Sequence, residues 1–174
     1  MVRKTVLRCL AAPFERGIIV TGAESAAIGA KVQDLPLTLV ENPNWELGQF
    51  SSILAGLQYL MTQIPDHPFN VAFILADQPF VHQSTYTQLI QASRLQPSQI
   101  IVPRFDGKRG NPTLFPYRLF REMINAPIDD TGGRRWLTPE NIFFLDVNDS
   151  GILKDIDRVS DLTIENAAEA EAGV

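Results

Sequence analysis

One carboxylate in the middle of the chain follows a run of apolar residues. Residues 71–76 are all apolar, and Asp77-Gln78-Pro79 comes directly after them. Such a run is typical of a buried strand, which Pro79 would stop. A carboxylate at the end of a buried strand can hold Mg²⁺ beside substrate phosphates, so Asp77 is a candidate metal ligand. An aspartate that only caps the next turn would give the same pattern.

A second acidic group lies further along the chain, at Asp155 and Asp157. Alternating residues of an extended segment point to opposite faces, so we expect only one of the two to reach a shared metal. A solvated turn with a capping aspartate would explain the same residues.

A basic segment runs from Arg104 to Pro112, directly after a predicted strand. Its three cations, two glycines and Asn-Pro step predict a mobile loop that closes over an anionic substrate. Guanidinium groups and backbone amides both bind phosphate oxygens, so this segment could contact the phosphates of a substrate. A solvated connection is the alternative.

Two further segments could offer a helix N-terminus to an anion. The first is Asp130 to Arg134, where Asp130 or Thr131 could cap a helix that begins near Gly132. The second is 42–52, where Gly48 and Ser52 stand at the start of a strongly amphipathic segment. Plain helix capping explains most of the first segment and is the more economical explanation of the second.

The order of the periodic segments predicts the elements that position these side chains. The predicted strands cover residues 17–22, 36–40, 71–76, 99–103 and 142–147. The predicted helices cover residues 2–12, 23–32, 49–63, 85–95, 119–124 and 159–170. This alternation indicates an α/β fold with a mainly parallel sheet and helices on both faces, in which ligands bind beyond the carboxyl ends of the strands. Without a repeat or a linker, residues 1–174 are expected to form one domain.

The composition excludes several classes of protein. Of the 174 residues, 45% are hydrophobic and 20% are charged, which argues against disorder and coiled coil. A net charge of −5 argues against binding to nucleic acid or to an anionic membrane. The single cysteine, Cys9, offers neither an internal disulfide nor a zinc cluster. No apolar run is long enough to span a bilayer, so a soluble cytoplasmic domain is expected.

These segments occur in the same order in one protein family. The chain resembles the molybdopterin-type nucleotidyltransferases, and among them the molybdenum cofactor cytidylyltransferase branch. The matching segments are Ile18 to Gly22, Asn42 to Gly48 with Ser52 and Gly56, Leu75 to Pro79, Gly107 to Phe115, Asp130 to Arg134, and Asp155 to Asp157. The resemblance implies a three-layer, Rossmann-like nucleotidyltransferase fold.

The resemblance also implies a reaction and a set of site residues. The reaction is the Mg²⁺-dependent transfer of CMP from CTP to molybdopterin, with release of pyrophosphate. Asp77 and Asp157 would hold the metal, and Asp77 and Arg109 would be the catalytic residues. The substrates would lie against Gly48, Ser52, Gln78, Pro79, Gly110, Asn111, Pro112, Asp130, Gly132 and Arg134. Transfer of this kind depends mainly on positioning and charge neutralisation, which suits a site with a metal and cations.

The sequence departs from the family at two places. Family members open with a strand and a Gly-rich phosphate loop of the form LAAGxSxRMGxxK, whereas here Leu10-Ala11-Ala12 is followed by Pro13-Phe14-Glu15. We therefore expect the first strand and the phosphate loop to be missing and turnover by these 174 residues to be negligible. An annotated start downstream of the true one and an inactive remnant are both open interpretations. In addition, Arg158-Val159 follows Asp157 where the family has Thr-Pro.

Two other functions are consistent with the sequence. The chain could be a non-catalytic remnant that binds a nucleotide or a protein partner, or that associates as a homo-oligomer through a sheet edge left exposed. It could also be a nucleotidyltransferase for another phosphate acceptor, with molybdopterin guanylyl transfer and sugar-phosphate activation as the candidates.

Overall fold

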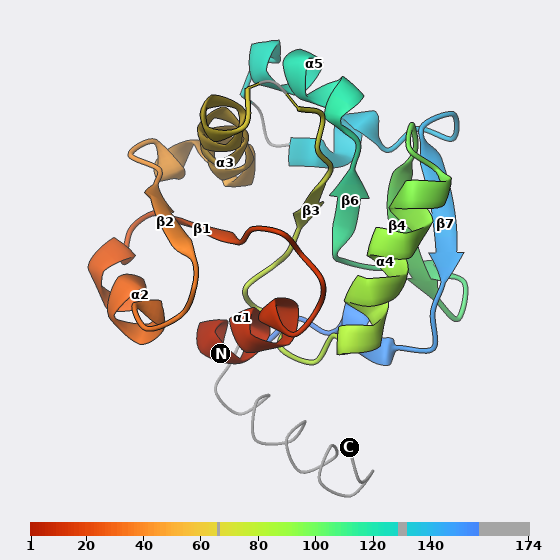
Figure 1. Cartoon of the computed structure of the whole chain (residues 1–174), viewed down its shortest axis with the longest axis horizontal. Helices are drawn as coiled ribbons and strands as arrows, with labels where there is room; N and C mark the ends of the chain where they lie inside the picture. The colour runs from red at the N-terminus through yellow and green to blue at the C-terminus, as the bar shows by residue number, and fades with distance from the viewer. Residues whose placement is uncertain (66, 129–131, 157–174) are drawn as a thin grey trace, which may run out of the picture.

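The computed structural model describes residues 1–65, 67–128 and 132–156 of the chain (Figure 1). The α-helices are α1 (Val2–Leu10), α2 (Ser25–Val32), α3 (Gln49–Gln63), α4 (Gln83–Leu95) and α5 (Phe120–Asn125). The strands are β1 (Ile18–Thr21), β2 (Thr38–Glu41), β3 (Val71–Phe73), β4 (Ile100–Phe105), β5 (Lys108–Arg109), β6 (Thr113–Phe115) and β7 (Ile142–Asp146). Short 3₁₀ helices are η1 (Trp45–Leu47), η2 (Tyr117–Leu119), η3 (Gly132–Trp136) and η4 (Ser150–Leu153).

The strands of the described residues form two sheets. β1 and β2 make a parallel pair, and the other strands form a five-stranded sheet in the order β3-β6-β4-β5, with β7 paired to β4. β3 and β4 are each antiparallel to β6, so they run in the same direction, and β7 is parallel to β4. The α/β class is confirmed. The sheet is mixed rather than mainly parallel, because β5 and β6, which were not predicted, run antiparallel to β4.

Helices cover both faces of the five-stranded sheet, as predicted. Ile100 and Val102 of β4 pack into one apolar cluster with residues of α3 and α5. Ile101, between them, packs into another cluster with residues of α4, and Figure 1 shows α4 lying over β4. Because side chains alternate along a strand, the buried run of β4 serves both layers.

The candidate residues follow strands that share one direction. Asp77 follows β3, the basic segment follows β4, and Asp155 follows β7. Figure 1 shows the ends of β3, β4 and β7 on the same side of the molecule as the start of α4. These three segments therefore lie at the carboxyl edge of the sheet, where ligands bind in open α/β folds.

Three of the predicted elements differ from the structure. The predicted strand 71–76 ends at Phe73, because Phe73 pairs with Thr113, the first residue of β6, and Pro112 before it has no N–H to extend the ladder. Asp77 therefore stands beyond the strand end, after a short non-strand segment. The basic segment is a β-hairpin rather than a mobile loop: β4 and β5 pair around a turn in which Asp106 and Gly107 have positive φ.

At Gly132 the structure has the 3₁₀ helix η3 in place of the expected α-helix. The predicted helix 159–170 lies outside the described residues. None of the described helices combines the length and the apolar character needed to cross a membrane.

Candidate active site

The 3₁₀ helix η4 is the point at which the site segments meet. The carbonyl oxygen of Ile152 accepts a hydrogen bond from the backbone N–H of Asn111, at 3.0 Å. The side-chain Nε2 of Gln78 reaches the same carbonyl at 3.5 Å. Segments that are far apart in the sequence, after β3 and before β6, are thus held against one short turn.

The residues that follow η4 bring one carboxylate to Gln78 and one backbone N–H to Asp77. Nε2 of Gln78 donates to Oδ1 of Asp155 at 2.7 Å, and the N–H of Ile156 donates to the backbone oxygen of Asp77 at 2.9 Å. Asp155 therefore lies beside the Asp77–Pro79 segment. Asp157, the second metal ligand that the resemblance implies, lies outside the described residues.

Close backbone contact explains two glycines at this place. A Cβ on Gly110 would lie 2.3 Å from the carbonyl oxygen of Ile152, and a Cβ on Gly151 would lie 2.2 Å from that of Phe80. Both distances are far below any van der Waals contact, so only glycine fits. We call this set of segments, residues 77–80, 110–112 and 149–156, the η4 junction.

The donor set of the η4 junction fits Mg²⁺. Gln78 is only 3% exposed, and its Oε1 is buried and accepts no hydrogen bond. Asp77 and Asp155 add carboxylate oxygens, which are the hard ligands that Mg²⁺ prefers. The described residues contain no group of three or more His, Cys, Asp or Glu side chains that could hold an ion. Asp77 and Asp155 could at most contribute one or two carboxylates to a metal whose remaining ligands come from substrate phosphates.

Arg109 stands on the exposed hairpin beside the junction. It lies on β5, where it pairs with Arg104 of β4, and its side chain is exposed. Arg104 is held in an ion pair, because its guanidinium donates to both carboxylate oxygens of Asp146 at 2.7 and 2.9 Å. This hydrogen bonding raises the pKa of Arg104 and lowers the pKa of Asp146. Arg109 is the cation that the hairpin presents next to Gly110 and Asn111.

Gly48 and Ser52 lie at the N-terminus of α3, in a different part of the fold. Gly48 has φ +90° and ψ 179°, a conformation that is essentially restricted to glycine, and nothing lies within 4 Å of a Cβ built on it. The buried side chain of Asn42 donates to Oγ of Ser51 at 2.8 Å and to Oγ of Ser52 at 3.1 Å. This network fixes the loop 42–48 and leaves the first turn of α3 open at Gly48.

Gly132 and Arg134 belong to η3, which packs against the start of α3. The rings of Trp136 and Phe50 are 5.5 Å apart, and the guanidinium of Arg135 lies 5.6 Å from the centre of the Phe50 ring. Arg134 is exposed, and Asp130 lies outside the described residues. Those predicted site residues that the structure describes therefore form two groups, one at the η4 junction and one where η3 meets α3.

Asp149 is a polar residue of the junction that sequence reasoning missed. Its carboxylate is 2% exposed and fully engaged in hydrogen bonds. A lone aspartate in a turn carries no local signal of burial. For Asp155, the Asp-x-Asp pattern supplied the candidates, but only the contact with Gln78 distinguishes Asp155.

Comparison with known proteins now decides the family. Residues 1–143 match the family model described as the MobA-like NTP transferase domain. The chain belongs to this family. Its nucleotidyltransferase-like character agrees with the Asp77 and Gly110–Pro112 segments assembled at the η4 junction.

Individual relatives of this MobA-like NTP transferase domain share the fold more than the sequence. The nicotine blue oxidoreductase of Paenarthrobacter nicotinovorans is 27% identical over 154 residues, which cover 83% of this chain and 72% of that protein. The crystal structure of Rv0371C from Mycobacterium tuberculosis in complex with manganese has a TM-score of 0.72 at 19% identity, covering 94% of this chain and 83% of that one. A 4-diphosphocytidyl-2C-methyl-D-erythritol synthase from Anaerococcus prevotii has a TM-score of 0.71 at 12% identity, covering 96% and 84%. These likenesses establish a mixed α/β nucleotidyltransferase fold.

Proposed function

We propose that this chain is a cytidylyltransferase domain that transfers CMP from CTP to molybdopterin and releases pyrophosphate. The observation that carries the proposal is the convergence of Asp77, Gln78 and Asp155 with Gly110–Pro112 around η4. The segment Gly110-Asn111-Pro112-Thr113-Leu114-Phe115 resembles the cytidylyl branch of the family, and its first three residues lie within this junction. The fold shared with a diphosphocytidyl synthase supports the same nucleotide.

In this reaction an oxygen of the acceptor phosphate attacks the α-phosphorus of CTP, and the bond from the α-phosphorus to the pyrophosphate oxygen breaks. Bound Mg²⁺ would supply charge neutralisation at the α-phosphate and at the leaving pyrophosphate. Asp77 would hold the metal, together with a carboxylate from the segment that contains Asp155 and Asp157. Arg109 would bind the acceptor phosphate at the hairpin, where guanidinium suits phosphate geometry.

No protein nucleophile is needed in this scheme. Cys9 is the single cysteine, and burial raises the pKa of its thiol, which keeps it protonated. The group at α3 would serve the nucleotide, because the open backbone at Gly48 and the helix N-terminus suit an anion.

The proposal is tested first by the binding of CTP and of the metal. Titration calorimetry should show CTP binding that depends on Mg²⁺ or Mn²⁺ and that is lost in Asp77→Asn. Asp146→Asn, an exposed carboxylate paired with Arg104, is the matched control and should leave CTP binding unchanged. Metal-dependent CTP binding that survives in Asp77→Asn would refute the assignment of Asp77.

Two paired experiments separate the remaining alternatives. Asp155→Asn and Asp157→Asn compared in the same titration identify the second carboxylate, since only one of them should weaken Mn²⁺ binding strongly. With a family-type Gly-rich segment joined ahead of Met1, CTP and molybdopterin should release pyrophosphate. Release with GTP, or with a sugar phosphate in place of molybdopterin, would assign a different transferase. Nucleotide binding without release in the extended chain would indicate a non-catalytic remnant.

A further inference from the structure

We propose that Asp149 is a positioning residue that holds the η4 junction together from its far side. It does not itself reach the metal or the substrates. The proposal deepens the proposed function and rests on it only for the consequence in metal binding. The consequence for the geometry of the junction is independent of any reaction.

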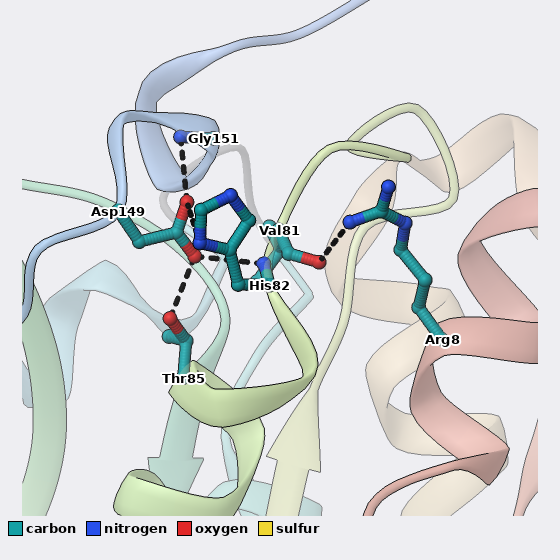
Figure 2. Close-up of polar contacts among 6 residues, drawn as sticks. All are labelled: Arg8, Val81, His82, Thr85, Asp149 and Gly151. Atoms are coloured by element: carbon teal, nitrogen blue, oxygen red, sulfur yellow. Dashed lines mark hydrogen bonds and ion pairs between the residues drawn. The ribbon is translucent and has the colours of Figure 1, made fainter. Parts of the chain in front are cut away.

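The carboxylate of Asp149 is buried and accepts hydrogen bonds from three donors. Figure 2 shows it between the start of α4 and the turn of η4. The N–H of His82 donates to Oδ2 at 2.8 Å, and Oγ1 of Thr85 donates to the same oxygen at 2.6 Å. The N–H of Gly151 donates to Oδ1 at 2.9 Å. All three neighbours are donors, so a carboxylate, which only accepts, fits this place. An amide side chain, which also carries donors, does not.

Asp149 binds the start of a helix that lies far away in the sequence. His82 stands at the N-cap position of α4 and makes no side-chain capping hydrogen bond. Asp149 accepts instead from the backbone N–H of His82 and from the hydroxyl of Thr85 in the first turn of α4, and its negative charge is favoured near that helix end by the helix dipole. The helix α4 is 13 residues long and packs on β4 through an apolar cluster. The hydrogen bonds to its first turn therefore connect the Asp149 carboxylate to a buried layer of the fold.

The segment after Asp149 transmits this anchoring to the candidate metal ligands. Gly151 lies flush against the Phe80 carbonyl, the Ile152 carbonyl binds Asn111 and Gln78, and the Ile156 N–H binds the backbone of Asp77. Asp155 lies between the last two of these contacts. The segment 149–156 thus connects the start of α4 to the candidate metal ligands. Loss of the Asp149 hydrogen bonds should therefore increase the mobility of both Asp155 and Asn111.

The turn that receives Asp149 is held from its other side as well. Arg8 of α1 donates to the carbonyl oxygen of Val81 at 3.3 Å, as Figure 2 shows. The imidazole Nδ1 of His82 is 3.8 Å from Oδ1 of Asp149. Asp149 is therefore the one side chain among those drawn that links the turn 81–82 to η4.

The test compares three variants of the full chain. Asp149→Asn keeps the shape of the side chain but replaces one accepting oxygen with an NH₂ group that faces other hydrogen-bond donors. Thr85→Val removes one of the three donors and keeps the side-chain volume. Met123→Ala is the matched control, because Met123 of α5 is fully buried in the apolar cluster of α3, α5 and β4, so its truncation lowers stability without contact to the junction. Hydrogen exchange is followed at the amides of Asn111 and Ile156, relative to the amides of β4, and Mn²⁺ binding is titrated in parallel.

We expect Asp149→Asn to raise exchange at Asn111 and Ile156 at least tenfold relative to β4 and to weaken Mn²⁺ binding at least fivefold. Thr85→Val should shift both in the same direction by a smaller factor. Met123→Ala should leave the relative exchange and the Mn²⁺ affinity within twofold. Equal relative exchange in Asp149→Asn and in the unmodified protein would overturn the proposal. If Asp149→Asn does not fold, Thr85→Val decides by the same criterion.

The hydrogen exchange and the metal titration can contradict different claims. An unmodified chain that binds no Mn²⁺ contradicts the proposed function, while the exchange at Asn111 and Ile156 still decides the role of Asp149. Faster exchange without weaker Mn²⁺ binding would show that Asp149 orders the backbone but does not position the metal ligands, which also overturns the positioning role.

Discussion

The η4 junction and the start of α3 both depend on glycine, for opposite reasons. At the junction, Gly110 and Gly151 have no room for a Cβ, because a carbonyl oxygen stands 2.3 or 2.2 Å from where it would lie. At the start of α3, Gly48 has open space around it and is required by its backbone angles instead. The first region is closed by packing of one backbone on another. The second is held by the Asn42 network and remains open at the helix end.

The difference indicates how each region can serve a ligand. A closed junction fixes the relative positions of side chains from distant segments, which a metal site requires. An open helix start leaves space for a ligand to approach the backbone N–H groups. Substitutions in the two regions should therefore affect stability and ligand binding differently.

Gly151→Ala should have the largest effect on stability. The added methyl would lie 2.2 Å from the Phe80 oxygen and 2.5 Å from its carbonyl carbon, so the backbone must move. We expect the free energy of unfolding to fall by about 3 kcal/mol or more, at the upper end for overpacking. Urea unfolding followed by circular dichroism measures the change. A loss below about 1 kcal/mol would show that the junction is not closed.

Gly48→Ala should cost about 2 kcal/mol of unfolding free energy, because a Cβ strains this backbone conformation although it meets no atom. The matched control is Gly107→Ala in the β4–β5 turn, which also has open space and a positive φ of 73°. The control should lose roughly 1 kcal/mol. Only Gly48→Ala should also weaken CTP binding. Equal CTP affinity in the two variants would remove the start of α3 from the nucleotide site.

Asp77→Asn should separate binding from folding at the junction. We expect Mn²⁺ affinity to fall at least tenfold, which corresponds to about 1.4 kcal/mol, because the charged ligand is replaced by a neutral one. The midpoint of urea unfolding without metal should change little. A fall in Mn²⁺ affinity that is matched by Asp146→Asn would mean that net charge, rather than the junction, governs the binding.

Arg104→Gln should have the smallest effect, since the Arg104–Asp146 pair is exposed and lies outside both regions. Arg104 lowers the pKa of Asp146, so the stabilisation is present at neutral pH and is lost as the pH falls through the lowered pKa of the folded state. The small deficit of the variant at pH 7 should therefore vanish in acid. A deficit that grows as the pH falls would contradict this sign. Urea midpoints measured from pH 7 to pH 3 give the comparison.

The periodicity of the chain predicted most of the fold. Residues 49–63 were predicted as a helix and form α3 with the same bounds, and the strands at β1, β2, β4 and β7 lie within one or two residues of prediction. These segments carry strong local patterns. The Asp106-Gly107 turn was visible as well and is a strong hairpin signal. The cations of the segment 104–112 nevertheless led to the prediction of a mobile loop there.

The reversed strand β6 could not be found in this way. Thr113 to Phe115 is a short segment beside two prolines, and its strand character comes from pairing with β3 and β4 on either side. The length of β3 is set by the same partner. Short strands depend on neighbours that periodicity does not reveal.

The sequence by itself determined which residue types could bind a metal and a phosphate, and that they follow strands of one direction, because strand order and apolar runs are local properties. Only the tertiary structure decided that Asp155 contacts Gln78 and that Asp149 binds the start of α4. Both contacts join residues more than sixty positions apart, and their geometry depends on how closely the Gly110 and Gly151 backbones pack. Distances of this kind arise from packing between layers, which no local pattern encodes.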